Sequence, residues 1–104
     1  MSRPAKPKID PPEHLTGDDL AFWSTVQRDY SIHDPAGLRL LRLACEATAT
    51  AELARLAIAR DGLTYVDRFG APRTRPESRI QVAAMTVFRS LCRELRLDPP
   101  EASK

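Results

Sequence analysis

The chain has 104 residues, of which 42% are hydrophobic and 29% charged, and its formal net charge at pH 7 is +2. This length suffices for one small domain with a modest core, which favours help from neighbouring subunits. No apolar run approaches the roughly 20 residues of a membrane span, so a membrane-spanning protein is excluded. The small net charge does not by itself indicate nucleic-acid binding.

Residues 1–13 hold four prolines and three basic residues with almost nothing apolar, a composition typical of a disordered arm. Lys6 and Lys8 in this arm are candidate contacts to DNA phosphates, and an inert tail is the alternative. The basic residues precede no apolar segment, so we expect neither a secretory signal nor an anchor, and the predicted compartment is the cytoplasm. The predicted domain covers residues 14–97, and residues 98–104 are expected to fray.

The first predicted helix begins after Thr16, a good N-cap residue, and runs to about Tyr30. Asp18 and Asp19 lie in its first turn, where acidic side chains are favourable. Leu20, Trp23 and Tyr30 recur at helical spacing. This pattern predicts a face that packs in the core rather than one that stacks on bases.

The second predicted helix begins at Pro35, after Asp34 as N-cap, and runs to about Arg60. Its apolar and small residues go nearly all the way round the helix. Two interpretations fit so broad an apolar surface. Either the helix mediates self-association, or it lies between the other two helices.

A β-hairpin is predicted between the second helix and the last one. Gly62 is expected to end the helix, LTYV alternates like a strand, DRFG supplies a turn, and APRT returns as the partner strand. Pro72 argues against a central strand, so the hairpin is expected to be an edge or a projecting arm. A lone ribbon is marginal in water, so it should lean on the helices or on another subunit.

The last predicted helix covers residues 76 to about 97 and is stopped by the Asp-Pro-Pro that follows. Its apolar stripe consists of Ile80, Ala84, Val87, Phe88, Leu91 and Leu95. The expected fold class is therefore mainly α, with three helices and a short β-hairpin inserted before the last.

Charge is unevenly distributed along the chain. Residues 14–34 hold four aspartates and one arginine, whereas residues 62–97 hold seven arginines and three acidic residues. Arginine suits bidentate contacts to phosphate or carboxylate, and a solvated helix surface is the alternative explanation.

The sequence contains no recognisable catalytic or metal-binding pattern. No glycine precedes the Lys-Ser/Thr pair of a phosphate loop, and no nucleophile and base pair by spacing. Cys45 and Cys92 form no zinc spacing with the two histidines, so both are interpreted as reduced packing residues. We expect no enzymatic activity, metal or cofactor.

Three phrases of the sequence, in this order, resemble the small terminase subunits of tailed bacteriophages over residues 14–99. They are W-x₆-Y at Trp23 and Tyr30, D-x₃-L at Asp34 and Leu38, and G-L-T-x-x-D-R-F-G-x-P-R-x-x-P over residues 62–76. One position departs from the pattern, because Arg75 stands where members of the family often have histidine. The departure adds a positive charge.

The resemblance implies a non-catalytic packaging factor in the cytoplasm of a bacterial host. Such a factor recognises viral double-stranded DNA, delivers it to the large terminase subunit and modulates that partner's ATPase and nuclease. The resemblance also implies a homo-oligomeric ring with a central channel. A ring would cover the apolar surface of the second helix and repeat the hairpin, so that weak phosphate contacts add up.

Arg68, Arg73 and Arg75 of the hairpin are the predicted DNA contacts, with Lys6 and Lys8 of the arm as further candidates. Exposure without function is the alternative for each, and Arg68 can instead pair with a nearby aspartate. Two other functions stay open. One is a helical adaptor of the packaging motor that does not bind DNA, and the other is a small dimeric phage regulator. The hairpin argues against the regulator, since a helix-turn-helix needs a tight turn.

Overall fold

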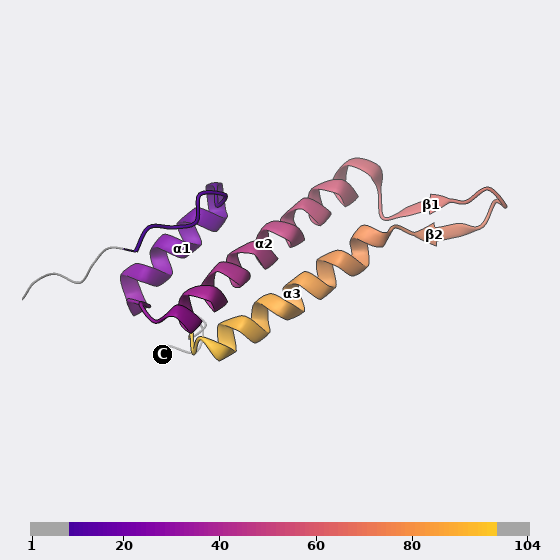
Figure 1. Ribbon diagram of the computed structural model, residues 1–104. Helices are drawn as coiled ribbons and strands as arrows, with labels where there is room; N and C mark the ends of the chain where they lie inside the picture. The colour runs from indigo at the N-terminus through magenta and orange to yellow at the C-terminus, as the bar shows by residue number, and fades with distance from the viewer. Residues whose placement is uncertain (1–8, 98–104) are drawn as a thin grey trace, which may run out of the picture.

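The computed structural model describes residues 9–97 and is mainly helical (Figure 1). The elements follow the order α1 (Gly17–Tyr30), α2 (Pro35–Asp61), β1 (Thr64–Val66), β2 (Pro72–Thr74) and α3 (Pro76–Glu94). The two strands pair antiparallel as a hairpin before the last helix. The predicted element order and fold class are confirmed.

Helix α1 begins after Thr16 as predicted, with Asp18 and Asp19 in its first turn. The Thr16 backbone is extended, but its side chain makes no capping hydrogen bond, so only its position agrees with the prediction. The helix ends where Ser31 turns left-handed, at a φ of 49°. The Gln27 side chain then accepts a hydrogen bond from the Ile32 amide at 2.8 Å, which satisfies a donor beyond the helix end.

Helix α2 has a complete start signal. The Asp34 carboxylate accepts a hydrogen bond from the Gly37 amide at 2.7 Å, and Pro35 occupies the first turn. A Cβ on Gly37 would lie 2.7 Å from Asp34 Oδ1 and 2.8 Å from Ile32 Cγ2, so the close approach requires glycine. Gly62, with a φ of 88°, ends the helix as predicted.

Helix α3 ends at Glu94, three residues before the predicted end at Leu97. Arg96 adopts a left-handed φ of 58°, its amide donates to the Arg93 carbonyl at 3.0 Å, and the Leu97 amide donates to the Cys92 carbonyl at 2.9 Å. These bonds form a Schellman closure, which turns Leu97 back onto the core. Tertiary packing of Leu97 therefore ends the helix before the prolines do.

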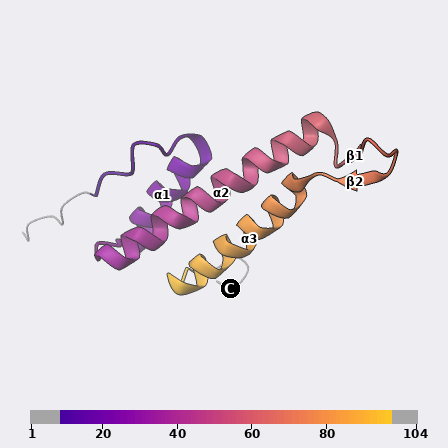
Figure 2. The same cartoon turned by 45° about the vertical axis from the view of Figure 1, so that its right-hand side comes forward.

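The core lies where α1 and the end of α3 meet the first half of α2. Its buried members are Leu15, Trp23, Val26, Leu41 and Cys45. Helix α2 packs against both other helices, and α2 and α3 lie side by side along their length (Figures 1 and 2). Helix α2 is thus central in that it contacts both other helices, whereas self-association through its remaining surface stays a prediction.

Two predicted core faces are only partly buried. On α1, Trp23 is buried as predicted, but Tyr30 is 42% exposed because the chain leaves the helix directly after it. On α3, Ala84 is buried while Ile80 and Val87 of the same stripe are exposed. Apolar surface therefore remains uncovered on the α2–α3 pair.

Both cysteines are unpaired, and Cys45 is completely buried in the core as a packing residue. Burial raises the pKa of the Cys45 thiol to about 12, so the group stays protonated at neutral pH. No helix in the described part of the chain is both long enough and apolar enough to cross a bilayer.

The predicted boundaries of the arm, domain and tail stay predictions. Residues 1–8 and 98–104, which include most of the arm and the whole tail, lie outside the described residues. Ile9, inside the predicted arm, packs against the core. Contact with the domain thus begins before residue 14.

Asp34→Ala is expected to lower the free energy of unfolding by about 1 kcal/mol, because it removes a capping hydrogen bond. Thr16→Ala is the matched control, since Thr16 holds the equivalent position in α1 without such a bond. Its expected effect is within about 0.5 kcal/mol. Urea unfolding followed by circular dichroism, at one protein concentration, measures both. Equal losses in the two variants would contradict the assignment.

Candidate nucleic-acid interface

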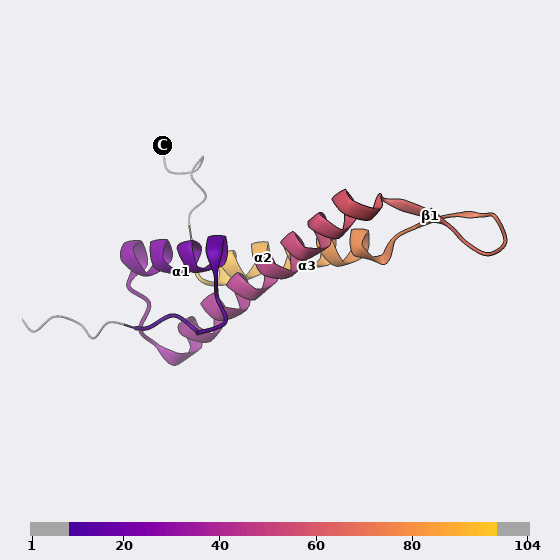
Figure 3. The same ribbon diagram turned by 90° about the horizontal axis from the view of Figure 1, so that it is seen from above.

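The hairpin projects beyond the ends of α2 and α3 and away from α1 (Figures 1 and 3). Its register pairs Thr64 with Thr74, Tyr65 with Arg73, and Val66 with Pro72. All six strand residues are exposed. The predicted projecting arm is confirmed, and within the described residues it rests on the helices only at its base.

Strand alternation gives the ribbon two different faces. Cross-strand partners share a face, and neighbours along a strand alternate between faces. Tyr65 and Arg73 therefore lie on one face. The amide of Arg75 donates to the Leu63 carbonyl at 2.8 Å, which extends the register and puts Arg75 on this same cationic face. The opposite face carries Thr64, Val66, Pro72 and Thr74, none of which is charged.

Asp67 organises the turn. Its Oδ1 accepts hydrogen bonds from the amides of Phe69 at 2.9 Å and Ala71 at 3.0 Å, and its Oδ2 accepts from Arg73 Nε at 3.0 Å. The Arg73 hydrogen bond, followed by those from the two amides, lowers the pKa of the Asp67 carboxyl. Gly70 completes the turn with a φ of 83°, a conformation that favours glycine.

Arg75 holds the base of the hairpin. Its Nε donates to the Asp61 carbonyl at 3.2 Å, and its guanidinium lies over the Tyr65 ring, 5.6 Å from the centroid. Since Asp61 is the last residue of α2, this contact joins the cationic face to the helix end. The aromatic support orients a guanidinium that is still partly exposed.

Arg68 lies in the turn, apart from the cationic face. Its guanidinium is 4.9 Å from the centroid of the Phe69 ring, and Phe69 is 79% exposed. The anticipated pairing of Arg68 with Asp67 is not seen, because Asp67 bonds Arg73 instead. The structure thus brings Arg73 and Arg75 together and separates Arg68 from them.

Each hairpin arginine keeps free N–H donors on its exposed side. Arg73 and Arg75 use Nε in the contacts described, which leaves the terminal guanidinium nitrogens for a ligand. Such planar forks suit phosphate oxygens. Lys6 and Lys8, the other predicted DNA contacts, lie outside the described residues.

The alternating pattern around DRFG holds a signal that the sequence interpretation did not use. Counting outward from the turn pairs Tyr65 with Arg73 and identifies Tyr65 as the aromatic ring that the Arg75 guanidinium contacts.

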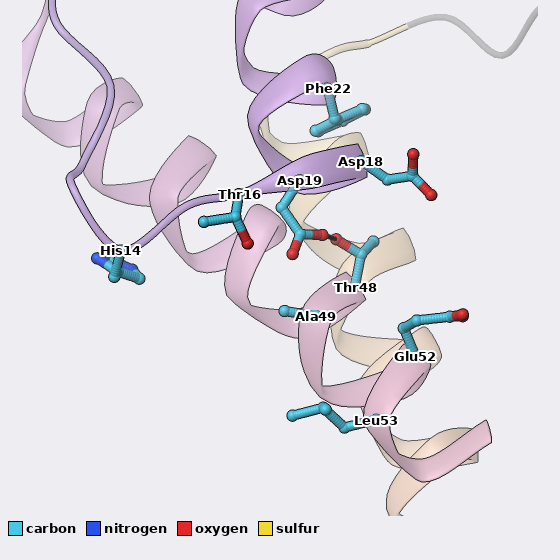
Figure 4. Close-up of a pocket in the computed structure, with 9 residues that line it drawn as sticks. All are labelled: His14, Thr16, Asp18, Asp19, Phe22, Thr48, Ala49, Glu52 and Leu53. Atoms are coloured by element: carbon cyan, nitrogen blue, oxygen red, sulfur yellow. Dashed lines mark hydrogen bonds between the residues drawn. The ribbon is translucent and has the colours of Figure 1, made fainter. Parts of the chain in front are cut away.

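A second feature, an acidic groove between α1 and α2, has no comparable local signal in the sequence. Asp19 faces Thr48 across it, and Asp18 and Glu52 line it from α1 and α2 (Figure 4). Among residues 9–97, no cluster of acidic, cysteine and histidine side chains is arranged to hold a metal ion.

The family of the chain follows from a comparison with protein-family models. The model described as phage terminase, small subunit, matches residues 24–104, which include the second half of α1 and everything after it. The chain therefore belongs to the phage terminase small subunit family, whose members have a role in DNA packaging and are generally non-catalytic. Comparisons with curated proteins and with solved structures gave no match. The resemblance noted in the sequence is confirmed.

The turn should depend on pH through Asp67. Folding lowers the pKa of this carboxyl, so the ionised group stabilises the turn. This contribution to stability is complete above the ordinary aspartate pKa of about 3.9 and is lost as the pH falls through the lowered value. We expect the NMR signals of the Phe69 and Ala71 amides to titrate with a midpoint below 3.9 or so. Asp67→Asn should abolish this titration. A midpoint at the ordinary value would contradict the assignment.

Proposed function

We propose that this small terminase subunit recognises viral double-stranded DNA and delivers it to the large terminase subunit in the cytoplasm of the bacterial host. Family membership supports the packaging role. The observation that carries the DNA contact is the cationic face of the projecting hairpin, where Arg73 and Arg75 are oriented by Asp67 and Tyr65. The phosphate backbone is the ligand that this face suits, and Arg68 adds charge at the tip.

Self-association is the second part of the proposal. A shallow groove of about 410 Å³ between α2 and α3 is lined by exposed apolar side chains, among them Leu43, Ile80 and Val87. A second copy of the chain is the proposed occupant, since burying this surface adds the apolar contact that a small domain lacks. We propose a homo-oligomeric ring that repeats the cationic face around its circumference.

A protein adaptor that never contacts DNA is the alternative function. The acidic groove beside α1 favours it, because Asp18 and Asp19 suit a basic partner surface. The dimeric regulator has no comparable support. Its helix-turn-helix would need α2 and α3 joined by a tight turn, and the hairpin separates them.

Binding to duplex DNA without a defined site is expected to weaken steeply with salt. Each phosphate contact contributes about 0.9 to the slope of log K against log salt, so Arg73→Ala with Arg75→Ala should flatten the slope by about 1 to 2 for each engaged subunit. Arg28→Ala is the matched control, since Arg28 also pairs with an aspartate but lies on α1. Fluorescence anisotropy at several salt concentrations measures the slopes. A folded oligomer that fails to bind DNA at low salt would support the adaptor instead.

Val87→Asp is expected to lower the solution mass, because it places a charge in the apolar groove between α2 and α3. Val82→Asp is the matched control, since Val82 is exposed on the same helix outside the groove. Light scattering at low and high salt measures both masses, and the wild-type mass should correspond to many subunits and survive salt. A wild-type monomer or dimer would contradict the ring.

A further inference from the structure

The tip of the hairpin, residues 67–70, presents an aromatic side chain on a fixed support. Phe69 is the most exposed of the large hydrophobic residues in the described part of the chain. Its amide is bound by Asp67 and its ring is covered on one side by the Arg68 guanidinium. An exposed aromatic ring held this way loses little conformational freedom on docking, which is the property of an interface anchor.

The acidic groove between α1 and α2 offers a matching surface (Figure 4). Its apolar part consists of Phe22, Ala49 and Leu53, and Leu53 is 70% exposed. Asp18, Asp19 and Glu52 supply its carboxylates. The space of about 500 Å³ admits an aromatic ring with a guanidinium beside it.

Charge distinguishes the tip from other exposed apolar segments. Within residues 9–97, neither Arg68 at the tip nor Asp18 at the groove belongs to an ion pair, whereas Asp19 bonds Thr48 and Glu52 pairs with Arg55. The Asp18 carboxylate therefore complements the unpaired Arg68 guanidinium. The phenyl ring of Phe69 also matches the apolar part of the groove, because both surfaces are hydrophobic and exposed.

The tip of a chain cannot reach its own groove. The strands run from the ends of α2 and α3 away from α1, whereas the groove lies between α1 and the middle of α2 (Figures 1 and 3). The occupant must come from another molecule. Because the tip and the groove are different surfaces, the contact is heterologous, and in the proposed ring each subunit would use its tip toward one neighbour and its groove toward the other.

We propose that the hairpin tip of one subunit docks into the acidic groove of the next, with Phe69 as anchor and Arg68 facing Asp18. This inference rests on the self-association proposed above and names a contact that carries it. It gives Arg68 a role between subunits and leaves Arg73 and Arg75, on the cationic face, for DNA.

Two variants test the contact by light scattering, with circular dichroism to confirm folding. Phe69→Ser in the tip and Leu53→Glu in the groove are each expected to lower the association constant about tenfold or more, because each removes one side of the anchor contact. Leu63→Ser is the matched control, since Leu63 is exposed at the base of the same hairpin. Its assembly should equal that of the wild type.

Mixing the two variants separates docking from general damage. Each chain then keeps one intact surface of the contact, so an equimolar mixture should form one-to-one dimers at a concentration at which either variant alone associates more weakly. The charge-swapped chain with Arg68→Glu and Asp18→Arg should likewise assemble better than either single variant. A structural defect would not be rescued in either experiment.

The outcomes distinguish this inference from the proposed function. A wild-type chain that stays monomeric overturns the ring and this docking contact together, and leaves the proposed DNA contact to its own test. A wild-type oligomer that persists in Phe69→Ser overturns the docking alone. If Leu53→Glu dissociates the oligomer while Phe69→Ser does not, the groove holds a different segment and the assignment of the tip is overturned. Loss of DNA binding in the Arg73 and Arg75 variants leaves the docking untouched.

Discussion

Burial of Leu41 and Cys45 on α2 is the constraint on which the arrangement of the helices depends. Both are fully inaccessible and contact a cluster that Trp23 and Val26 of α1 complete. A leucine buried to this extent contributes about 1.5 to 3 kcal/mol, a large share of the stability of so small a domain. Farther along α2 the buried residues are alanines, which let α3 approach closely but leave larger apolar side chains outside.

The unequal packing along α2 determines where the two candidate sites lie. The well-packed end holds α1 and forms one wall of the acidic groove, while the thinly packed end carries the hairpin into solvent. Charged side chains mark both sites, because Asp18 and Asp19 line the acidic groove while Arg68, Arg73 and Arg75 belong to the hairpin. In the proposed ring, these two surfaces would meet between subunits, and repetition would concentrate the hairpin arginines.

Local signals made much of this fold predictable. Asp34 with Pro35, Gly62 and Gly70 each fix a backbone conformation through their own chemistry, so the elements that they begin or end were located correctly. Nonlocal effects explain the errors. Arg96 carries no residue preference for a positive φ, and only the return of Leu97 to the core imposes it. The acidic groove depends on how two helices cross, which periodicity does not specify.

The attachment of the hairpin has a mechanical consequence. Its strands are locked in register from the base upward, where Arg75 bonds both Leu63 and Asp61. The orientation of the ribbon is therefore set by the ends of the two helices that it joins. A substitution at Arg75 would thus act on the direction of the whole ribbon as well as on its charge.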